Sequence, residues 1–128
     1  RFAAPNIIVL SAEFSLSSDD GSAKERAREY CESRRLKQPL NYPSAGSTFK
    51  RPAGHYAGAL IEQAGLKGLK VGGAEVSTLH AGFVINTGGA TCDDVCELMK
   101  IVQNEVYDRF GIMLEPEVKI IGREVCSL

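Results

Sequence analysis

The sequence predicts an α+β domain in which about three helices pack on a mostly antiparallel sheet. One long stretch, from Thr91 to Phe110, carries its apolar residues at helical spacing. Residues 6–16 and 112–121 instead alternate apolar and polar side chains, as strands do. With 128 residues and no repeat, low-complexity segment or linker, the chain is expected to form a single domain, residues 1–128.

The composition excludes several kinds of protein. A content of 44% hydrophobic and 24% charged residues is ordinary for a soluble globular domain. The net charge of −1 argues against a nucleic-acid partner, and no apolar run reaches the roughly 18 residues that span a bilayer. Four cysteines fit no metal-site spacing, so we expect no metal but reduced, partly buried thiols, which suit a cytoplasmic location: Cys31, Cys92, Cys96 and Cys126.

The first third of the chain predicts one strand and one helix. Residues 6–16 form the strand, whose first half is apolar on both faces. Ser22 followed by Glu25 has the spacing of a capping box, which would open a charge-rich helix through Arg35. The cations Arg34 and Arg35 in its last turn are explained by the helix dipole without any ligand.

A short helix, a connection and two strands are expected next. His55 to Ala64 places four residues on one helical face, and Gly65 would supply a left-handed C-terminal cap: Tyr56, Leu60, Ile61 and Ala64. Residues 65–73 are glycine-rich but match no phosphate-binding motif, so we interpret them as a connection. Strands are predicted at 74–79 and 82–86, followed by a turn at Thr87-Gly88-Gly89.

The last helix and the last strand have marked ends. Thr91 with Asp94 resembles a capping box, and Gly111 would stop the helix. In the strand 112–121, Pro116 removes one backbone donor and predicts an edge or irregular position. The alternation predicts that three apolar side chains face the core: Leu114, Val118 and Ile120. The charged side chains between them are predicted to face away from the core: Glu115, Glu117 and Lys119.

The segment from Pro43 to Pro52, PSAGSTFKRP, has the composition of a binding loop. Both prolines fix φ and lack an N–H, which predicts a constrained connection rather than a central strand. Small residues leave the Ser47 hydroxyl accessible, and Lys50 and Arg51 place positive charge nearby, as a phosphate or carboxylate ligand would require. Clusters of serine, glycine and proline are also common in plain surface turns, so local composition leaves both interpretations open.

Three motifs, taken together, resemble one enzyme family. They are PSAGSTFKRP, the later HAGFVIN at residues 80–86, and LEPEVKIIG at residues 114–122. In this order and spacing they resemble UDP-N-acetylenolpyruvoylglucosamine reductase (MurB), and specifically its C-terminal substrate-binding domain, over almost the whole chain. The resemblance implies a reductase that uses FAD and NADPH to convert UDP-N-acetylglucosamine enolpyruvate to UDP-N-acetylmuramate in peptidoglycan synthesis. It also implies FAD-binding domains before this chain and no cofactor site within it.

The same resemblance implies two catalytic residues. Ser47 would be the general acid that protonates a carbanion-like intermediate, a role for which a serine needs a strongly basic carbon within hydrogen-bond reach. Glu117 would act on the developing enolic carboxylate, either protonated or through water, since two ionised carboxylates would repel each other. Arg1-Phe2 resembles the end of a Tyr-Arg-x-Ser-x-Phe motif, so the catalytic arginine would fall just before residue 1 and the chain alone would be inactive.

Four residues would bind substrate. By resemblance Lys37 meets the diphosphate, and Lys50 and Arg51 continue the cationic wall, with Arg51 standing where many relatives carry asparagine. His80 falls where some relatives have a polar, substrate-facing residue, although a lone histidine is often structural.

Two other functions compete with that of a reductase. The alternative is a non-catalytic module that binds a nucleotide-sugar or phosphorylated ligand, and Glu117 distinguishes it, because a diphosphate binder gains nothing from a carboxylate near the serine. A serine hydrolase is disfavoured because Ser47 lies in no GxSxG elbow.

Overall fold

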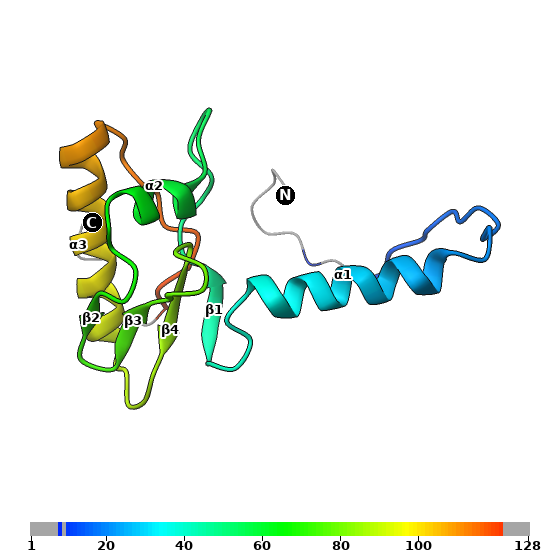
Figure 1. Cartoon of the computed structure of the whole chain (residues 1–128), viewed down its shortest axis with the longest axis horizontal. Helices are drawn as coiled ribbons and strands as arrows, with labels where there is room; N and C mark the ends of the chain where they lie inside the picture. Colours follow the sequence, from blue (N-terminus) through cyan, green and yellow to red (C-terminus); the bar gives the residue numbers. More distant parts are fainter. Residues whose placement is uncertain (1–7, 9, 122–128) are drawn as a thin grey trace.

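The structure, a computed structural model, describes residues 8 and 10–121. The elements in chain order are α1 (Ala23–Lys37), β1 (Ser44–Ser47), α2 (Ala57–Gln63), β2 (Lys70–Val71), β3 (Ala74–Val76), β4 (Phe83–Asn86) and α3 (Cys92–Phe110). These three helices and four strands confirm the expected α+β class (Figure 1).

The strands form one antiparallel sheet in the order β1-β4-β3-β2. In the β2–β3 hairpin Gly72 has φ +51°, and a Cβ on Gly73 would lie 2.4 Å from the Gly88 carbonyl oxygen and from the Ala90 nitrogen. The glycine-rich connection is therefore required by close backbone packing, and it contains the strand β2, which the sequence did not predict.

The helix α3 begins and ends as predicted. The Thr91 hydroxyl accepts the Asp94 N–H at 3.1 Å, the Asp94 carboxylate accepts the Thr91 N–H at 2.9 Å, and Gly111 adopts φ +67°. Four residues of its apolar stripe are fully buried and pack against β2 and β3, each contributing about 1.5–3 kcal/mol: Leu98, Met99, Val102 and Val106. The stripe is weaker at its ends than predicted, since Val95 is half-buried and Phe110 is 36% exposed. The shorter helix α2 adds Leu60 and Ile61 to the same core and contacts α3.

The helix α1 is present but differs from the prediction in two ways. The capping box between Ser22 and Glu25 does not form; instead the Asp19 carboxylate accepts the Ala23 N–H at 3.1 Å. None of the helix residues is buried, and Figure 1 shows the helix extending away from the sheet. The expectation that it packs on the sheet is therefore wrong, because its composition offers no apolar stripe to bury.

The predicted terminal strands are also wrong where the structure describes them; residues 6, 7 and 9 of the first one lie outside the described residues. Residues 8 and 10–16 have no regular structure, and Ile8, Leu10, Phe14 and Leu16 are 78–92% exposed. Residues 112–121 are extended, yet they make a single isolated bridge, between Phe49 and Pro116. An alternating pattern assigns side chains to two faces, but a strand also needs a hydrogen-bonding neighbour, and the pattern does not supply one.

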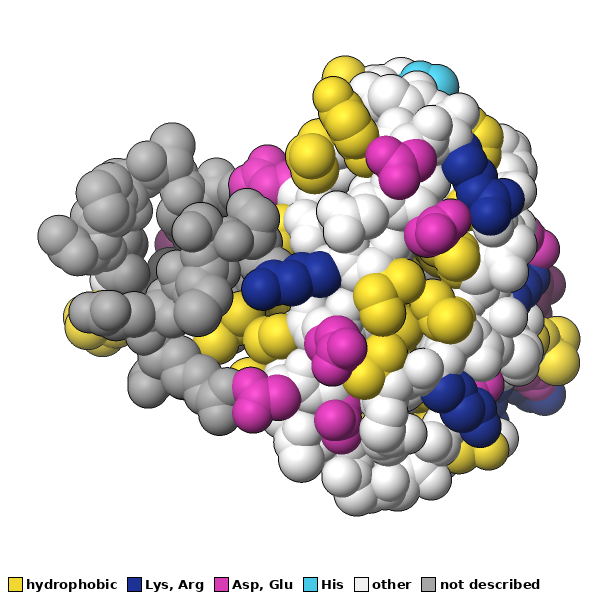
Figure 2. Space-filling view, turned by 90° about the vertical axis from the view of Figure 1, so that its left-hand side faces the viewer, with side chains coloured by type: hydrophobic (Ala, Val, Ile, Leu, Met, Phe, Trp, Pro, Cys, Tyr) yellow, Lys and Arg dark blue, Asp and Glu magenta, His cyan; other side chains and the backbone are white. Residues whose placement is uncertain are grey.

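Several other expectations concern thiols, membranes and charge. Arg1, Phe2 and Cys126 lie outside the described residues. Among the described cysteines, Cys96 is half-buried, but Cys31 and Cys92 are exposed, so the expectation of partly buried thiols is wrong for these two. None of the three described helices is long and apolar enough to cross a membrane. Figure 2, which views the α3 side, shows acidic and basic side chains interspersed on this face.

Candidate functional site

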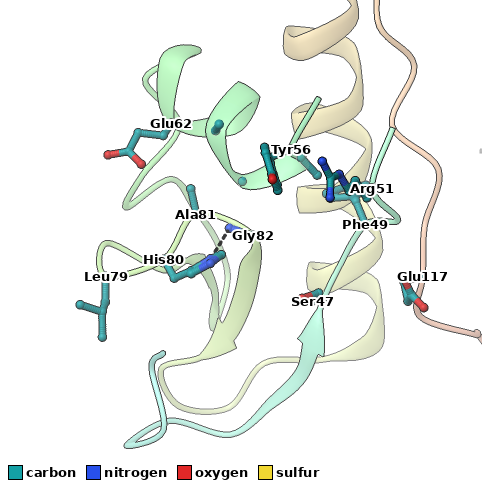
Figure 3. Close-up of a pocket in the computed structure, with 13 residues that line it drawn as sticks. Ser47, Phe49, Arg51, Tyr56, Glu62, Leu79, His80, Ala81, Gly82 and Glu117 are labelled. Carbon is teal, nitrogen blue, oxygen red and sulfur yellow. Dashed lines mark hydrogen bonds between the residues drawn. The ribbon is translucent and has the colours of Figure 1, made fainter. Parts of the chain in front are cut away.

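A pocket of about 500 Å³ lies where four segments meet: the end of β1, the start of α2, the β3–β4 turn and the extended C-terminal segment (Figure 3). Its lining is Ser47, Phe49, Arg51, Tyr56, Ala57, Gly58, Ala59, Glu62, Leu79, His80, Ala81, Gly82 and Glu117. A volume of this size is typical of a small-molecule site.

The pocket collects four of the six residues singled out from the sequence. Ser47 and Arg51 come from the Pro43–Pro52 segment, His80 from the β3–β4 turn, and Glu117 from the C-terminal segment. Lys37 and Lys50 do not line it. Ser47 and Glu117 are about seventy residues apart in sequence, so only the fold brings them to one cavity.

Thr48 holds three of these segments together. Its N–H donates to the Gly82 carbonyl oxygen at 2.9 Å, and its carbonyl oxygen accepts the Glu117 N–H at 2.9 Å. Its buried hydroxyl accepts the Val84 N–H at 3.0 Å, at the point where the β1–β4 register is irregular. Sequence analysis missed this role, because nothing distinguishes Thr48 from the other hydroxyl residues of the loop.

The segment PSAGSTFKRP is more ordered than the predicted connection. Its first half is the strand β1, an edge strand in which Ser44 pairs with Ile85 and Ser47 with Phe83. Pro43 stands directly before the strand, where a missing donor is tolerated, and its carbonyl oxygen still accepts the Asn86 N–H at 2.9 Å.

The two cations of the loop have different neighbours. The Lys50 ammonium forms an ion pair with the Glu115 carboxylate, and the Lys50 N–H donates to the Glu115 carbonyl oxygen at 2.8 Å. The Arg51 guanidinium instead lies 3.9 Å from the centre of the Tyr56 ring. Tyr56 is 63% exposed, so its predicted place on the apolar face of α2 is wrong, and it forms part of the pocket wall with Arg51.

His80 is held in one orientation by the turn that carries it. Its Nδ1 accepts the Gly82 N–H at 3.1 Å, and its ring packs edge-on against Phe83 with 5.0 Å between ring centres. The buried Ser77 hydroxyl accepts the backbone N–H groups of Leu79 and His80 at 3.2 and 3.3 Å. His80 is therefore a fixed element of the pocket wall.

Lys37 lies in the last turn of α1 and is exposed. Nearby, Arg35 and Gln38 line a second hollow of about 320 Å³, which shares Leu79 with the first pocket. Of the expected cationic wall, the structure places Arg51 in the main pocket and leaves Lys37 and Lys50 outside both hollows.

The chemistry available in the pocket follows from this lining. It offers two hydroxyl groups, two carboxylates, one guanidinium and one imidazole: Ser47, Tyr56, Glu62, Glu117, Arg51 and His80. No cluster of three or more His, Cys, Asp or Glu side chains in the described ranges could hold a metal ion. Apolar walls from Phe49 and Leu79 leave room for an organic ligand between these polar groups.

Comparisons with known proteins agree on one family. A family model described as "UDP-N-acetylenolpyruvoylglucosamine reductase, C-terminal domain" matches residues 38–121. A reductase of that name from Syntrophomonas wolfei is 51% identical over 124 residues, which are 96% of this chain and 42% of that protein. One from Caldicellulosiruptor bescii is 50% identical over 125 residues, covering 95% of this chain and 40% of the relative.

A solved structure is similar as well. The crystal structure of UDP-N-acetylenolpyruvylglucosamine reductase (MurB) from Thermus caldophilus matches with a TM-score of 0.65 and 42% sequence identity, over 75% of this chain and 33% of that one. The chain spans about two fifths of the length of the curated relatives that it matches.

Proposed function

This chain belongs to the UDP-N-acetylenolpyruvoylglucosamine reductase (MurB) family as its C-terminal domain, and we propose that it binds the substrate and supplies two catalytic groups of such a reductase. The proposed reaction reduces UDP-N-acetylglucosamine enolpyruvate to UDP-N-acetylmuramate for peptidoglycan synthesis in the cytoplasm. We call the longer protein that would carry this domain the full-length reductase.

The proposed cofactors, FAD and NADPH, are assigned to the FAD-binding domains of the full-length reductase and to no residue of this chain. When bound there, they supply the hydride that reaches the methylene carbon of the substrate. The residues of this domain would bind the UDP-sugar, hold its enolpyruvyl group in place and deliver the proton.

Ser47 is the proposed proton donor to the carbon next to the methylene group. The observation that carries the proposal is that Ser47 and Glu117 line one pocket, although they come from distant parts of the sequence. A serine hydroxyl is a weak acid, so it transfers its proton only to a strongly basic carbon at hydrogen-bond distance. The hydrogen bonds of Thr48 on both sides support this role, because they restrict how Ser47 can move relative to the pocket.

Glu117 is proposed to act on the substrate carboxylate as negative charge develops there. To do so it would carry a proton or work through a water molecule, because two ionised carboxylates repel each other. Its backbone is fixed against Thr48, which supports a defined position for a side chain that is otherwise exposed.

Lys37, Lys50, Arg51 and His80 are proposed to bind the substrate. Arg51 has the best support, since it lines the pocket and is oriented by Tyr56 and by a 3.3 Å hydrogen bond from its Nε to the His55 carbonyl oxygen. Lys50 is paired with Glu115 and would have to leave it to contact the ligand, and Lys37 would have to reach the ligand from the end of α1. Both lysines would therefore attract the anionic ligand mainly through their positive charge.

The experiment that tests the proposal follows the flavin absorbance of the full-length reductase in two half-reactions. NADPH should bleach the flavin, and the enolpyruvyl substrate should restore its colour, whereas the 128-residue chain alone should catalyse no turnover. A protein that binds the UDP-sugar but never reoxidises the flavin would instead support the non-catalytic binding module.

A further inference from the structure

We propose that Gln103 is a positioning residue of the reductase. Its side-chain amide donates to the Leu114 carbonyl oxygen at 2.8 Å, and this bond sets how far the C-terminal segment has advanced when it passes the main pocket. In this register the lining of the pocket includes Glu117 but not Glu115 or Lys119. The role given to Glu117 rests on the proposed function, which this inference deepens by naming the residue that puts the carboxylate in place.

Gln103 is a polar residue on the buried side of α3. It is only 7% exposed and lies among the four fully buried residues of the apolar stripe. An amide loses its hydrogen bonds to water when it is buried, so an apolar side chain of similar size would be less costly there unless the amide has a partner. The Leu114 carbonyl oxygen is that partner. The bond is therefore a specific contact between α3 and the C-terminal segment.

The alternating pattern of the segment does not by itself choose which residue reaches the pocket. Side chains on a strand have a period of two, so a shift by two residues keeps the apolar side chains towards the core but replaces Glu117 with another charged residue. A shift by one residue is opposed by Pro116, which pairs with Phe49 at a position where the backbone N–H is not used. The bonds on either side are made by the Glu115 carbonyl oxygen, at 2.8 Å, and the Glu117 N–H, at 2.9 Å.

The short connection after α3 excludes a shift by two residues in one direction. Gln103 lies seven residues, about 10 Å, before the helix end at Phe110, and helical side chains lean towards the N-terminus, which does not shorten this distance. The chain reverses at Gly111 and runs back in the opposite direction (Figure 1). The four steps from Phe110 to Leu114 span at most about 14 Å, whereas the two steps to Ile112 span about 7 Å. Ile112 therefore cannot take the place of Leu114 at the amide.

The Gln103 amide opposes a shift in the other direction. Such a shift would lengthen the connection and bring Lys119 to the position of Glu117. It would also break the bond at Leu114, whose side chain is fully buried. Leu114 is thus held by its side chain through packing and by its carbonyl group through Gln103. Removing the amide while keeping the packing should loosen Glu117 without unfolding the domain.

The first test measures this contact without any activity. Amide hydrogen exchange of the 128-residue chain reports how often each backbone bond opens. Gln103→Met keeps the size of the side chain but has no donor, and we expect the Lys50 and Glu117 N–H groups to exchange about 10-fold faster relative to the Val84 N–H in the sheet. Val102→Ala is the matched control, because it weakens the core on the same helix but keeps the amide. Unchanged exchange at Glu117, or the same relative acceleration in both variants, would overturn the proposal.

The second test follows the flavin absorbance of the full-length reductase. Gln103→Met should slow reoxidation by substrate about 10- to 100-fold and leave KM for the UDP-sugar within about 2-fold, because a displaced carboxylate affects the reaction more than the binding. The same substitution should cause no further loss in a Glu117→Gln background, whereas a merely structural glutamine would slow both. Val102→Ala should react at nearly the natural rate. An additive loss in the double variant, or a higher KM with unchanged kcat, would reject the positioning role.

Gln103→Leu, a second replacement without a donor, serves in both tests if the methionine variant does not fold. If neither variant folded, Gln103 would be a structural residue and the proposal would be overturned. Failure of the full-length protein to turn over substrate would reject the proposed function and the catalytic role of Glu117. The exchange experiment would still decide whether Gln103 holds the segment in its register.

Discussion

The backbone N–H of Glu117 donates a hydrogen bond to the carbonyl oxygen of Thr48, with 2.9 Å between nitrogen and oxygen. Thr48 directly follows Ser47, so this contact brings the backbone of the proposed acid-base residue beside that of the proposed proton donor, together with the Lys50 N–H bond to the Glu115 carbonyl oxygen. The extended segment after α3 therefore completes the site through its backbone, even though it joins the sheet by a single bridge.

Ser47→Ala in the full-length reductase should leave flavin reduction by NADPH nearly intact and slow reoxidation by substrate about 10²- to 10⁴-fold, because only the second half-reaction needs the proton. Stopped-flow absorbance separates the two steps. Ser44→Ala is the matched control, since Ser44 lies on the same strand but outside the pocket. An unchanged rate of reoxidation in the Ser47 variant would reject the general-acid role.

Glu117→Gln should slow the same half-reaction at least about 10²-fold without lowering the melting temperature of the domain. The amide keeps the shape of the side chain and leaves the backbone contact with Thr48 intact, but it cannot carry or share the proton. Glu115→Gln is the control, because Glu115 pairs with Lys50 at the surface and does not line the pocket; losing that pair should cost only about 0–1 kcal/mol. If both variants reacted at the same rate, Glu117 would be an ordinary surface carboxylate.

Lys37→Ala should raise KM for the UDP-sugar more than it lowers kcat, since a contact to the diphosphate is remote from the reacting carbon. A lost charged hydrogen bond corresponds to about 1.5–3 kcal/mol of binding free energy. Lys24→Ala, in the first turn of the same helix, controls for the change in net charge. An unaltered KM would leave Lys37 with the role of a cation at a helix C-terminus.

Thr48→Val should lower the free energy of unfolding of this domain by about 1–3 kcal/mol, because it leaves the Val84 N–H without its acceptor in a buried place. Urea denaturation measures the change, and the exposed Thr78→Val serves as the reference substitution. A Thr48 variant as stable as the reference would show that the hydroxyl does not hold β1 to β4.

Asp94 should make stability depend on pH at the acidic end. Hydrogen bonds from the backbone N–H groups of Thr91 and Gly73 hold the pKa of the Asp94 carboxyl below its ordinary value of 3.8. A folded pKa below the unfolded one gives a stabilisation that is present above pH 3.8 and is lost as the pH falls through the folded pKa. Denaturation curves between pH 2 and pH 6 should show this loss in the natural domain and in Asp108→Asn, but less of it in Asp94→Asn.

The sequence by itself determined the features that depend on neighbours along the chain. The capping box of Thr91 and Asp94, the buried stripe of α3 and the left-handed Gly111 each follow from spacings within one helix. The motif residues Ser47 and Glu117 were also found from sequence, through their resemblance to a family, and the comparisons confirmed that family.

Only the tertiary structure decided what depends on partners distant in the chain. Strand pairing is non-local, so the alternating residues 8 and 10–16 remain unpaired, while Ser44–Ser47 forms a strand that its prolines had argued against. The contrast between Lys50 and Arg51 likewise comes from Glu115 and Tyr56, which the fold places beside them. Thr48 acquires its three contacts for the same reason: every residue except proline carries both a backbone donor and an acceptor, and the fold decides which of them meet.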